Sequence, residues 1–205
     1  MVVIGAGGHA KEIAGIFAEL DQDDNLIFYD DITPDLPLLL FDRFQIVRHP
    51  DDLKKVFKHD PRFVIGVGNP AIRKILAEKF ITLGGKLTSI ISPFANIGKF
   101  NVTLGEGLNI MTGAVITQDV IIGQGSLLHV HTSVHHDCRI GEYCELQPGS
   151  HILGHVKMGN HCVVGSGATI LPRIVLGNNV VVGAGAVVTK NLADGVKVKG
   201  VPARS

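Results

Sequence analysis

The sequence of 205 residues predicts two structural parts: an α/β, half-Rossmann-like domain over residues 1–91, followed by a parallel β-helix over residues 92–205. Three observations support this fold class. Strands alternate with helices in the first part, an aliphatic residue recurs every six positions in the second, and a hydrophobic content of 45% is ample for packed cores. We expect the boundary near Ile91-Ser92-Pro93.

The first part reads as a small parallel sheet with helical connections. Residues 1–4 form a buried strand, residues 5–8 a tight glycine turn, and residues 9–20 a helix with one apolar face. A second strand over residues 26–29 ends in Asp30-Asp31, and a polar, proline-bearing connection follows. The remaining elements are expected as a helix at 52–58, a strand at 63–67, a helix at 70–83 and a strand at 87–90.

The second part carries a repeat of six residues. Its aliphatic members are Leu104, Ile110, Ile116, Ile122, Leu128, Val134, Ile140, Leu146, Ile152, Met158, Val164, Ile170, Leu176, Val182 and Val188. Small or β-branched residues follow four positions later and include all three cysteines, which we expect to be buried fillers without chemistry. Each repeat supplies one short strand and one turn. Because no long loop interrupts this span, a site must lie on its outer surface or between subunits.

Composition narrows the classes of partner. Lys+Arg and Asp+Glu both total 19, so the chain has no net positive charge that would attract nucleic acid or anionic lipid. No apolar run approaches the roughly 18 residues of a membrane span, and the first residues are too short an apolar run for a signal peptide. An odd number of cysteines without zinc spacing suits a reducing compartment. We therefore expect a cytoplasmic protein that acts on small molecules.

The glycine turn indicates a nucleotide site. Gly5-Ala6-Gly7-Gly8-His9-Ala10 fits the pattern G-x-G-x-x-A after a strand, and Asp30 stands 25 positions after Gly5. Backbone N–H groups at a helix N-terminus bind phosphate, and a carboxylate at a strand end accepts hydrogen bonds from ribose or base. Gly66-Val67-Gly68-Asn69 ends another strand and follows the same logic. One nucleoside diphosphate, a nicotinamide dinucleotide and a purely steric turn remain open; the short sheet favours the first.

Five motifs occur in order along the chain: Gly5-Ala6-Gly7-Gly8-His9-Ala10-Lys11, Phe28-Tyr29-Asp30-Asp31, Gly66-Val67-Gly68-Asn69 with Arg73, His136-Asp137-Cys138 and Gly200-Val201-Pro202-Ala203-Arg204. With them the sequence resembles, over essentially its whole length, the nucleotide-sugar acetyltransferases of the sialic acid O-acetyltransferase type. That group includes bacterial N-acetyltransferases for UDP- or GDP-linked amino sugars in surface glycan synthesis. The resemblance implies a left-handed β-helix whose triangular coils each contain three repeats, a homotrimer, and acetyl-CoA as co-substrate.

The resemblance also assigns roles to residues. The positions that match nucleotide-sugar contacts are Gly7, Gly8, His9, Asp30, Asp31 and Gly68. Acetyl-CoA is expected along the β-helix between two subunits, near Glu145, Ser166 and Ala184. The sequence departs from one family pattern, because Glu145 stands where an N-acetyltransferase has histidine and His129 stands where asparagine is common.

His136 matches the catalytic base, with Asp137 as the adjacent acid. Histidine suits proton removal near neutral pH, and a carboxylate orients its ring. Gly154 is expected one coil further on, where its N–H is placed to stabilise an oxyanion. The same coil spacing stacks Asp137 with His155, either in a surface charge ladder or as a second titrating group. His131 falls in a column of glycines, so we expect it to project from a groove.

Other functions stay open at this stage. N-acetylation of a nucleotide-linked amino sugar is the first choice, and O-acetylation of sialic acid or a related sugar is the second. No metal is expected, although a β-helix enzyme of the carbonic anhydrase type is the main rival, since five histidines offer enough imidazoles: His129, His131, His135, His136 and His155. A non-catalytic nucleotide-binding scaffold is a further alternative.

Overall fold

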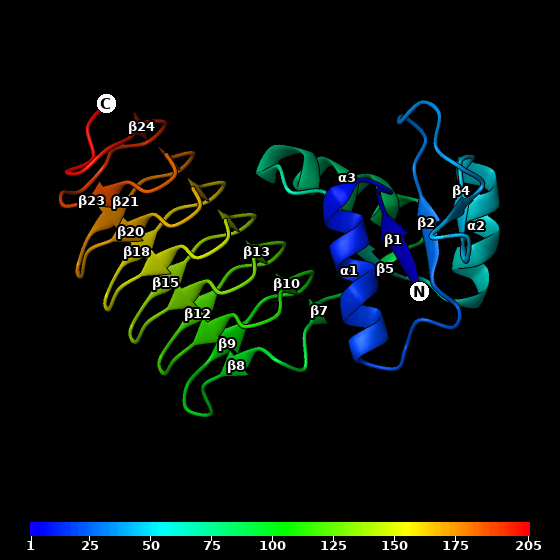
Figure 1. Cartoon of the computed structure of the whole chain (residues 1–205), viewed down its shortest axis with the longest axis horizontal. Coiled ribbons are helices and arrows are strands. Elements are labelled where there is room, and N and C mark those ends of the chain that lie inside the picture. The colour runs from blue at the N-terminus through cyan, green and yellow to red at the C-terminus, as the bar shows by residue number, and fades with distance from the viewer.

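The structure, a computed structural model, describes all 205 residues and places an α/β domain beside a three-sided β-helix (Figure 1). The α/β sheet has the strand order β3-β4-β2-β1-β5-β6. Every neighbouring pair is parallel except β3 with β4. Its strands are β1 (Val2–Ile4), β2 (Ile27–Tyr29), β3 (Leu39–Leu40), β4 (Phe44–Val47), β5 (Arg62–Ile65) and β6 (Lys86–Leu87).

The structure adds to one expectation about these strands and corrects another. The polar, proline-bearing connection after Asp31 contains β3 and β4, and β4 buries Phe44, Ile46 and Val47 against the sheet. The strand expected at 87–90 is two strands, since Leu87 ends β6 in the α/β sheet and Ile90 starts β7 (Ile90–Ile91) in the β-helix. Short apolar runs carry too little periodicity to show which sheet they join.

Three helices cover the α/β sheet. Helix α1 (Gly8–Glu19) lies between the sheet and the β-helix (Figure 1), and it buries Ala10, Ile13, Ile16 and Phe17. Helices α2 (Pro50–His59) and α3 (Pro70–Thr82) pack on the opposite face. Both start with proline, whose fixed φ suits a first helical turn. None of the helices combines the length and apolar character that crossing a bilayer requires.

The β-helix has three faces of stacked, two-residue strands. Face 1 comprises β7, β10 (Asn109–Ile110), β13 (Leu127–Leu128), β16 (Glu145–Leu146), β19 (Val163–Val164), β22 (Val181–Val182) and β24 (Lys197–Val198). Face 2 comprises β8 (Asn96–Ile97), β11 (Val115–Ile116), β14 (Ser133–Val134), β17 (His151–Ile152), β20 (Thr169–Ile170) and β23 (Val187–Val188). Face 3 comprises β9 (Thr103–Leu104), β12 (Ile121–Ile122), β15 (Arg139–Ile140), β18 (Lys157–Met158) and β21 (Val175–Leu176).

The six-residue repeat maps directly onto these strands. Each repeat aliphatic is the second residue of its strand, and parallel partners such as Ile110 and Leu128 lie 18 positions apart. The left-handed β-helix predicted from the repeat and the resemblance is therefore confirmed. Cys138, Cys144 and Cys162 are buried free thiols within the same core cluster, as expected of inward fillers.

The α/β domain docks on face 1. Ile90, Met111 and Leu127 of the β-helix join α1 in one apolar cluster. Burial of such side chains contributes about 1.5–3 kcal/mol each, which fixes the two parts against each other. In a three-sided prism, the edge between faces 2 and 3 lies opposite face 1. The turns at that edge are therefore separated from the α/β domain of the same chain by the width of the prism.

Candidate active site

A cavity of about 300 Å³ opens in the α/β domain where β1, β2 and β5 end. Parallel strands meet with their carboxyl ends at one edge, which is where ligands bind in such sheets. All the residues expected to contact the nucleotide line it: Gly7, Gly8, His9, Asp30, Asp31 and Gly68. Leu76 and Phe80 of α3 supply an apolar side. The β-helix contributes no residue to the lining.

The two aspartates at the end of β2 have different environments. Asp30 is buried, and its carboxylate accepts hydrogen bonds from the backbone N–H groups of Ala6, Ile32 and Thr33 at 2.9–3.2 Å. Its oxygens also accept the Thr33 hydroxyl, so Asp30 shapes the turn that borders the cavity. Asp31 is half-exposed and keeps one carboxylate oxygen without a partner within the chain. Of the two, Asp31 has the carboxylate that is open to a ligand.

Asp31 is held by two donors. The Tyr29 hydroxyl donates to Oδ2 at 3.0 Å and the Lys79 ammonium donates to the same oxygen at 3.1 Å. Burial would raise the pKa of Asp31, but these hydrogen bonds outweigh it and leave the pKa below its usual value. Burial also raises the pKa of Tyr29, so the phenol stays protonated as a donor. The carboxylate is therefore charged and fixed at the cavity wall.

The N-terminus of α1 forms another wall. Gly7 is the N-cap and Gly8 the first helical residue, with no side-chain cap and no acidic residue in the first turn. A Cβ at either glycine would have nothing within 4 Å, so these positions are open. Free N–H groups and the positive end of the helix dipole attract phosphate. The N-terminus of α1 is therefore unobstructed at the cavity wall.

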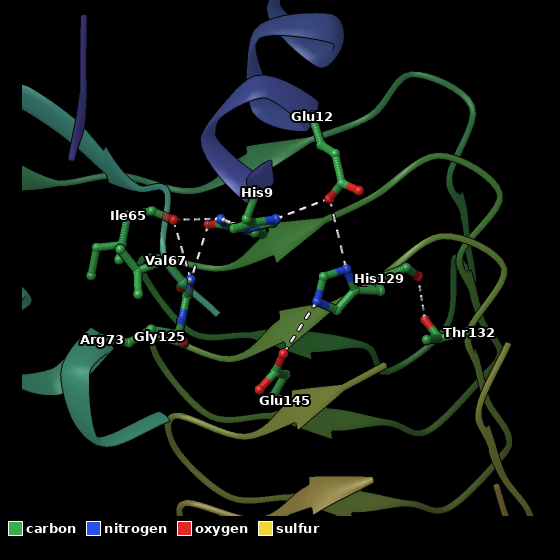
Figure 2. A network of polar contacts seen from close by, with 10 residues as sticks. His9, Glu12, Ile65, Val67, Arg73, Gly125, His129, Thr132 and Glu145 are labelled. Carbon is green, nitrogen blue, oxygen red and sulfur yellow. Dashed lines mark hydrogen bonds and ion pairs between the residues drawn. The ribbon is translucent and has the colours of Figure 1, made fainter. Parts of the chain in front are cut away.

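Beneath this wall, Arg73 of α3 is fully buried and joins both parts of the molecule. Figure 2 shows its guanidinium donating to the backbone oxygens of Gly125 and Val67, each at 2.8 Å. It also approaches the side-chain oxygen of Asn109 in β10 at 3.4 Å. Burial lowers the pKa of Arg73 to about 10, so the charge remains at neutral pH. A buried cation with several acceptors is costly to disturb.

Glu145 lies in β16 on face 1, at the junction with the α/β domain. Its Oε1 accepts a hydrogen bond from His129 Nε2 at 3.4 Å (Figure 2), and a Cβ at Gly68 would approach that oxygen to 2.9 Å. Burial would raise the pKa of Glu145, but the His129 hydrogen bond and the charge of Arg73 lower it overall. The two departures from the family pattern, Glu145 and His129, therefore form one pair beside the cavity.

The His136–Asp137 pair occupies the edge between faces 2 and 3. His136 Nδ1 lies 2.7 Å from Asp137 Oδ2. Because a carboxylate only accepts, Nδ1 carries the hydrogen, and the Nε2 lone pair is left free. The hydrogen bond to His136 holds the pKa of Asp137 below its usual value. The side chain of His136 is 59% exposed, so this edge is open to a substrate or a second subunit.

Gly154 and His155 complete this edge. A Cβ at Gly154 would meet His136 Nε2 at 2.7 Å, which places the glycine directly under the ring. The N–H of Gly154 donates no hydrogen bond within the chain. His155 stands edge-on to His136 with 5.2 Å between ring centroids, and its Nε2 is 3.7 Å from Asp137. The stacking of His155 beside Asp137 that the coil spacing predicts is present, and His155 therefore borders the His136–Asp137 pair.

The remaining predicted residues lie elsewhere on the β-helix. Ser166 and Ala184 are exposed in successive turns between faces 1 and 2, where Gly185 N–H donates to Ser166 O at 2.8 Å. His131 is exposed in an earlier turn and covers Gly113. The five histidines weighed for a metal centre are thus distributed over separate places, and the groups that bring two imidazoles and a carboxylate together are His9–Glu12–His129 and His136–Asp137–His155.

Several site residues were missed from the sequence. Glu12, Thr33, Lys79 and Asn109 make the contacts described above, but only the fold brings them to the site. Asn109 gave no signal in the sequence, because a polar residue at the outward position of a strand is ordinary, and only the structure shows that it is fully buried.

Comparisons with known proteins agree with this arrangement. The family profile described as PglD N-terminal domain matches residues 1–80, and the bacterial transferase hexapeptide profile matches residues 119–154, 137–172 and 155–190. A search of curated proteins finds no significant match.

Solved structures match the whole chain. A mutant of perosamine N-acetyltransferase from Caulobacter crescentus, in complex with CoA and GDP-perosamine, is 30% identical with a TM-score of 0.89, over 99% of this chain and 94% of that one. The acetyltransferase domain of PglB from Neisseria gonorrhoeae, with acetyl coenzyme A, is 29% identical with a TM-score of 0.90, over 99% and 97%. WeeI from Acinetobacter baumannii is 27% identical with a TM-score of 0.88 and the same coverage.

Proposed function

The chain belongs to the hexapeptide-repeat family of sugar N-acetyltransferases, and we propose that it transfers acetyl from acetyl-CoA to the amino group of a sugar carried on a nucleoside diphosphate. The observation that carries this proposal is the coexistence of a nucleotide-type cavity and an open His136–Asp137 pair in one chain. The relative with GDP-perosamine and CoA matches both parts at once.

The nucleotide is proposed to occupy the cavity in the α/β domain. Gly7 and Gly8 offer their N–H groups to the diphosphate, and Asp31 offers its free oxygen to the ribose or base. Asp30 supports this wall from behind. The sugar then leaves the cavity past His9 and Gly68, toward face 1 and its junction with the α/β domain.

His136 is proposed to act as general base. The amine nitrogen attacks the thioester carbonyl carbon, and His136 Nε2 takes the proton that the nitrogen loses. The C–S bond breaks as the tetrahedral intermediate collapses, and the proton passes to the departing thiolate. Asp137 holds the ring and stabilises the imidazolium. The free N–H of Gly154 stabilises the oxyanion, a contribution of about 3–4 kcal/mol for such a donor.

Acetyl-CoA is the proposed co-substrate, as in the solved relatives that bind CoA or acetyl coenzyme A. We place it along the β-helix near Glu145, Ser166 and Ala184. The exposed turns of Ser166 and Ala184 give a smooth edge for an extended ligand. Since acetyl-CoA and nucleotide sugars are cytoplasmic metabolites, we also propose a cytoplasmic location.

The site is proposed to form between subunits of a homotrimer. The cavity belongs to the domain docked on face 1, whereas His136 stands at the edge opposite that face. One chain therefore keeps its nucleotide and its base apart, and a neighbouring chain supplies the missing half. A closed ring of three such contacts is a heterologous, cyclic assembly.

A thiol-release assay with acetyl-CoA and a panel of UDP-, GDP- and dTDP-linked amino sugars, together with free sialic acids, tests the function. We expect release only with an amino sugar, and a product in which mass spectrometry and NMR locate the new acetyl group on nitrogen. Acetylation on oxygen would replace N-acetylation with the O-acetyl alternative. Tight nucleotide binding without release by any acceptor would contradict the enzyme and favour a scaffold.

A further inference from the structure

His9 is the one imidazole in the cavity lining, and its surroundings define its chemistry. It is the second residue of α1, and its ring packs against His129 with 5.2 Å between centroids. Nε2 lies 3.0 Å from Asn109 Nδ2, and Nδ1 lies 3.2 Å from Glu12 Oε2. Figure 2 shows the contact of the ring with Glu12. The identity of each partner decides which nitrogen carries the hydrogen.

The orientation of the Asn109 amide is determined by two neighbours that have only one role each. The backbone oxygen of Ile65 is an acceptor and lies 2.8 Å from Asn109 Nδ2. The Arg73 guanidinium is a donor and lies 3.4 Å from Asn109 Oδ1. The nitrogen of the amide must therefore face Ile65, and its second hydrogen points at His9.

It follows that His9 Nε2 accepts a hydrogen bond. In a neutral ring the hydrogen then sits on Nδ1, where the Glu12 carboxylate accepts it. Burial, together with the nearby charge of Arg73, lowers the pKa of His9 to about 3, so the ring stays neutral at physiological pH. A ring in this state has no free lone pair for a base or for a cation held with Glu12 and His129. In the group His9–Glu12–His129, the Glu12 carboxylate therefore accepts a hydrogen bond from His9, and His129 Nδ1 lies 3.9 Å from the same oxygen without a hydrogen bond.

We propose that Asn109 is a positioning residue that fixes His9 as a permanently neutral Nδ1–H donor to the bound substrate. Glu12, whose side chain is 54% exposed, holds this hydrogen in the free protein and gives it up when an oxygen of the diphosphate or sugar enters the cavity. Only the identity of the ligand rests on the function proposed above. The β-helix thereby sets the chemistry of a residue in the other domain.

Nitrogen-15 histidine spectra of the full-length protein test the tautomer directly, with His9 assigned by loss of its signals in His9→Gln. We expect a protonated Nδ1 and an unprotonated Nε2, unchanged between about pH 5.5 and pH 8.5. A protonated Nε2, or titration within that range, overturns the proposal. Because no substrate is present, a failure of the acetyltransferase function would leave this result intact.

The same spectra show whether the Nδ1–H of His9 exchanges its hydrogen bond to Glu12 for one to the substrate. We expect the Nδ1–H signal to move on addition of UDP or GDP if a phosphate oxygen accepts it, or only with the acetyl-accepting nucleotide sugar if a sugar oxygen does. Either result supports the exchange. An unmoved signal at saturating nucleotide sugar contradicts it.

Asn109→Asp replaces the amide N–H that donates to His9 Nε2 with a carboxylate oxygen that can only accept, and it changes the shape of the side chain little. We expect the hydrogen to move to Nε2 and the KM for the nucleotide sugar to rise about tenfold, the effect of one lost hydrogen bond. The kcat, its pH profile and the KM for acetyl-CoA stay within about twofold, since His136 is untouched. Asn96→Asp, the same change at the exposed start of β8, is the matched control with wild-type constants. An Asn109→Asp protein whose His9 keeps Nδ1–H contradicts the proposal.

Discussion

The ring of His136 lies directly over Gly154 of the next coil, so closely that a Cβ there would come within 2.6 Å of Cε1 and 2.7 Å of Nε2. The relationship joins the proposed base to the only backbone N–H beneath it that has no partner within the chain. It arises from the 18-residue coil, which stacks the two turns.

Gly154→Ala tests this stacking. The added methyl group displaces the imidazole, and a shift of about 1 Å lowers turnover about a hundredfold. The KM for the nucleotide sugar stays unchanged because the residues proposed to hold the nucleotide, Gly7, Gly8 and Asp31, are untouched. Steady-state thiol release measures both constants. Gly15→Ala, at an exposed helix position with nothing within 4 Å, is the control and retains full turnover. Equal turnover in the two variants would refute the stacking argument.

The proposed binding of the diphosphate at the N-terminus of α1 is tested by two substitutions of Gly8 that differ only in charge. Gly8→Asp places a carboxylate where the diphosphate is proposed to bind, without a steric clash. We expect at least a tenfold rise in the KM for the nucleotide sugar, since repulsion between two negative charges in contact costs more than about 1.4 kcal/mol. Gly8→Asn has the same shape without the charge and gives a much smaller rise. Calorimetry with UDP and GDP measures the two affinities, and similar losses in both variants would argue against a phosphate contact.

The neutrality of His9 has a consequence for stability. Its pKa falls from 6.5 to about 3 on folding, so between these values the unfolded chain binds a proton that the folded protein does not. The contribution of His9 to the free energy of unfolding is therefore fully present above pH 6.5. It decreases as the pH falls from 6.5 toward 3, by up to about 1.4 kcal/mol per pH unit. Between pH 7 and pH 5, the free energy of unfolding measured in urea should fall by about 2 kcal/mol more for wild type than for His9→Gln. The same loss in both proteins would show that His9 does not resist protonation.

The pairing of subunits is tested by mixing two impaired chains at a nucleotide-sugar concentration below the wild-type KM. At that concentration Gly8→Asp is impaired in its cavity, and His136→Ala lacks the base. If one chain supplies the cavity and its neighbour the base, co-expressed hetero-trimers regain about a third of wild-type activity, because one of their three sites combines an intact cavity with an intact base. Tagged, purified hetero-oligomers give the measurement, with the separately purified variants as controls. No recovery would mean that both halves of the site come from one chain.

The sequence reveals the β-helix because every repeat places its aliphatic residue inside, as Ile110 and Leu128 do. It also indicates the residues that line the cavity, because glycines and acids follow strand ends. It does not reveal Asn109, whose outward position is polar in an ordinary way and becomes buried only when the α/β domain docks. The pair of Glu145 with His129 escapes for another reason: both residues lie in the β-helix, but they stand 16 positions apart instead of the 18 that separate paired strand residues.

The proposed reaction depends above all on His136, which removes the proton from the acceptor amine. The direct measurement is turnover of His136→Ala with acetyl-CoA and the nucleotide amino sugar that wild type accepts, in protein whose circular dichroism and oligomeric size match wild type. We expect turnover to fall about a hundredfold to ten-thousandfold, the range for loss of a general base, with the KM for the nucleotide sugar little changed. Near-wild-type turnover in such a protein would contradict it.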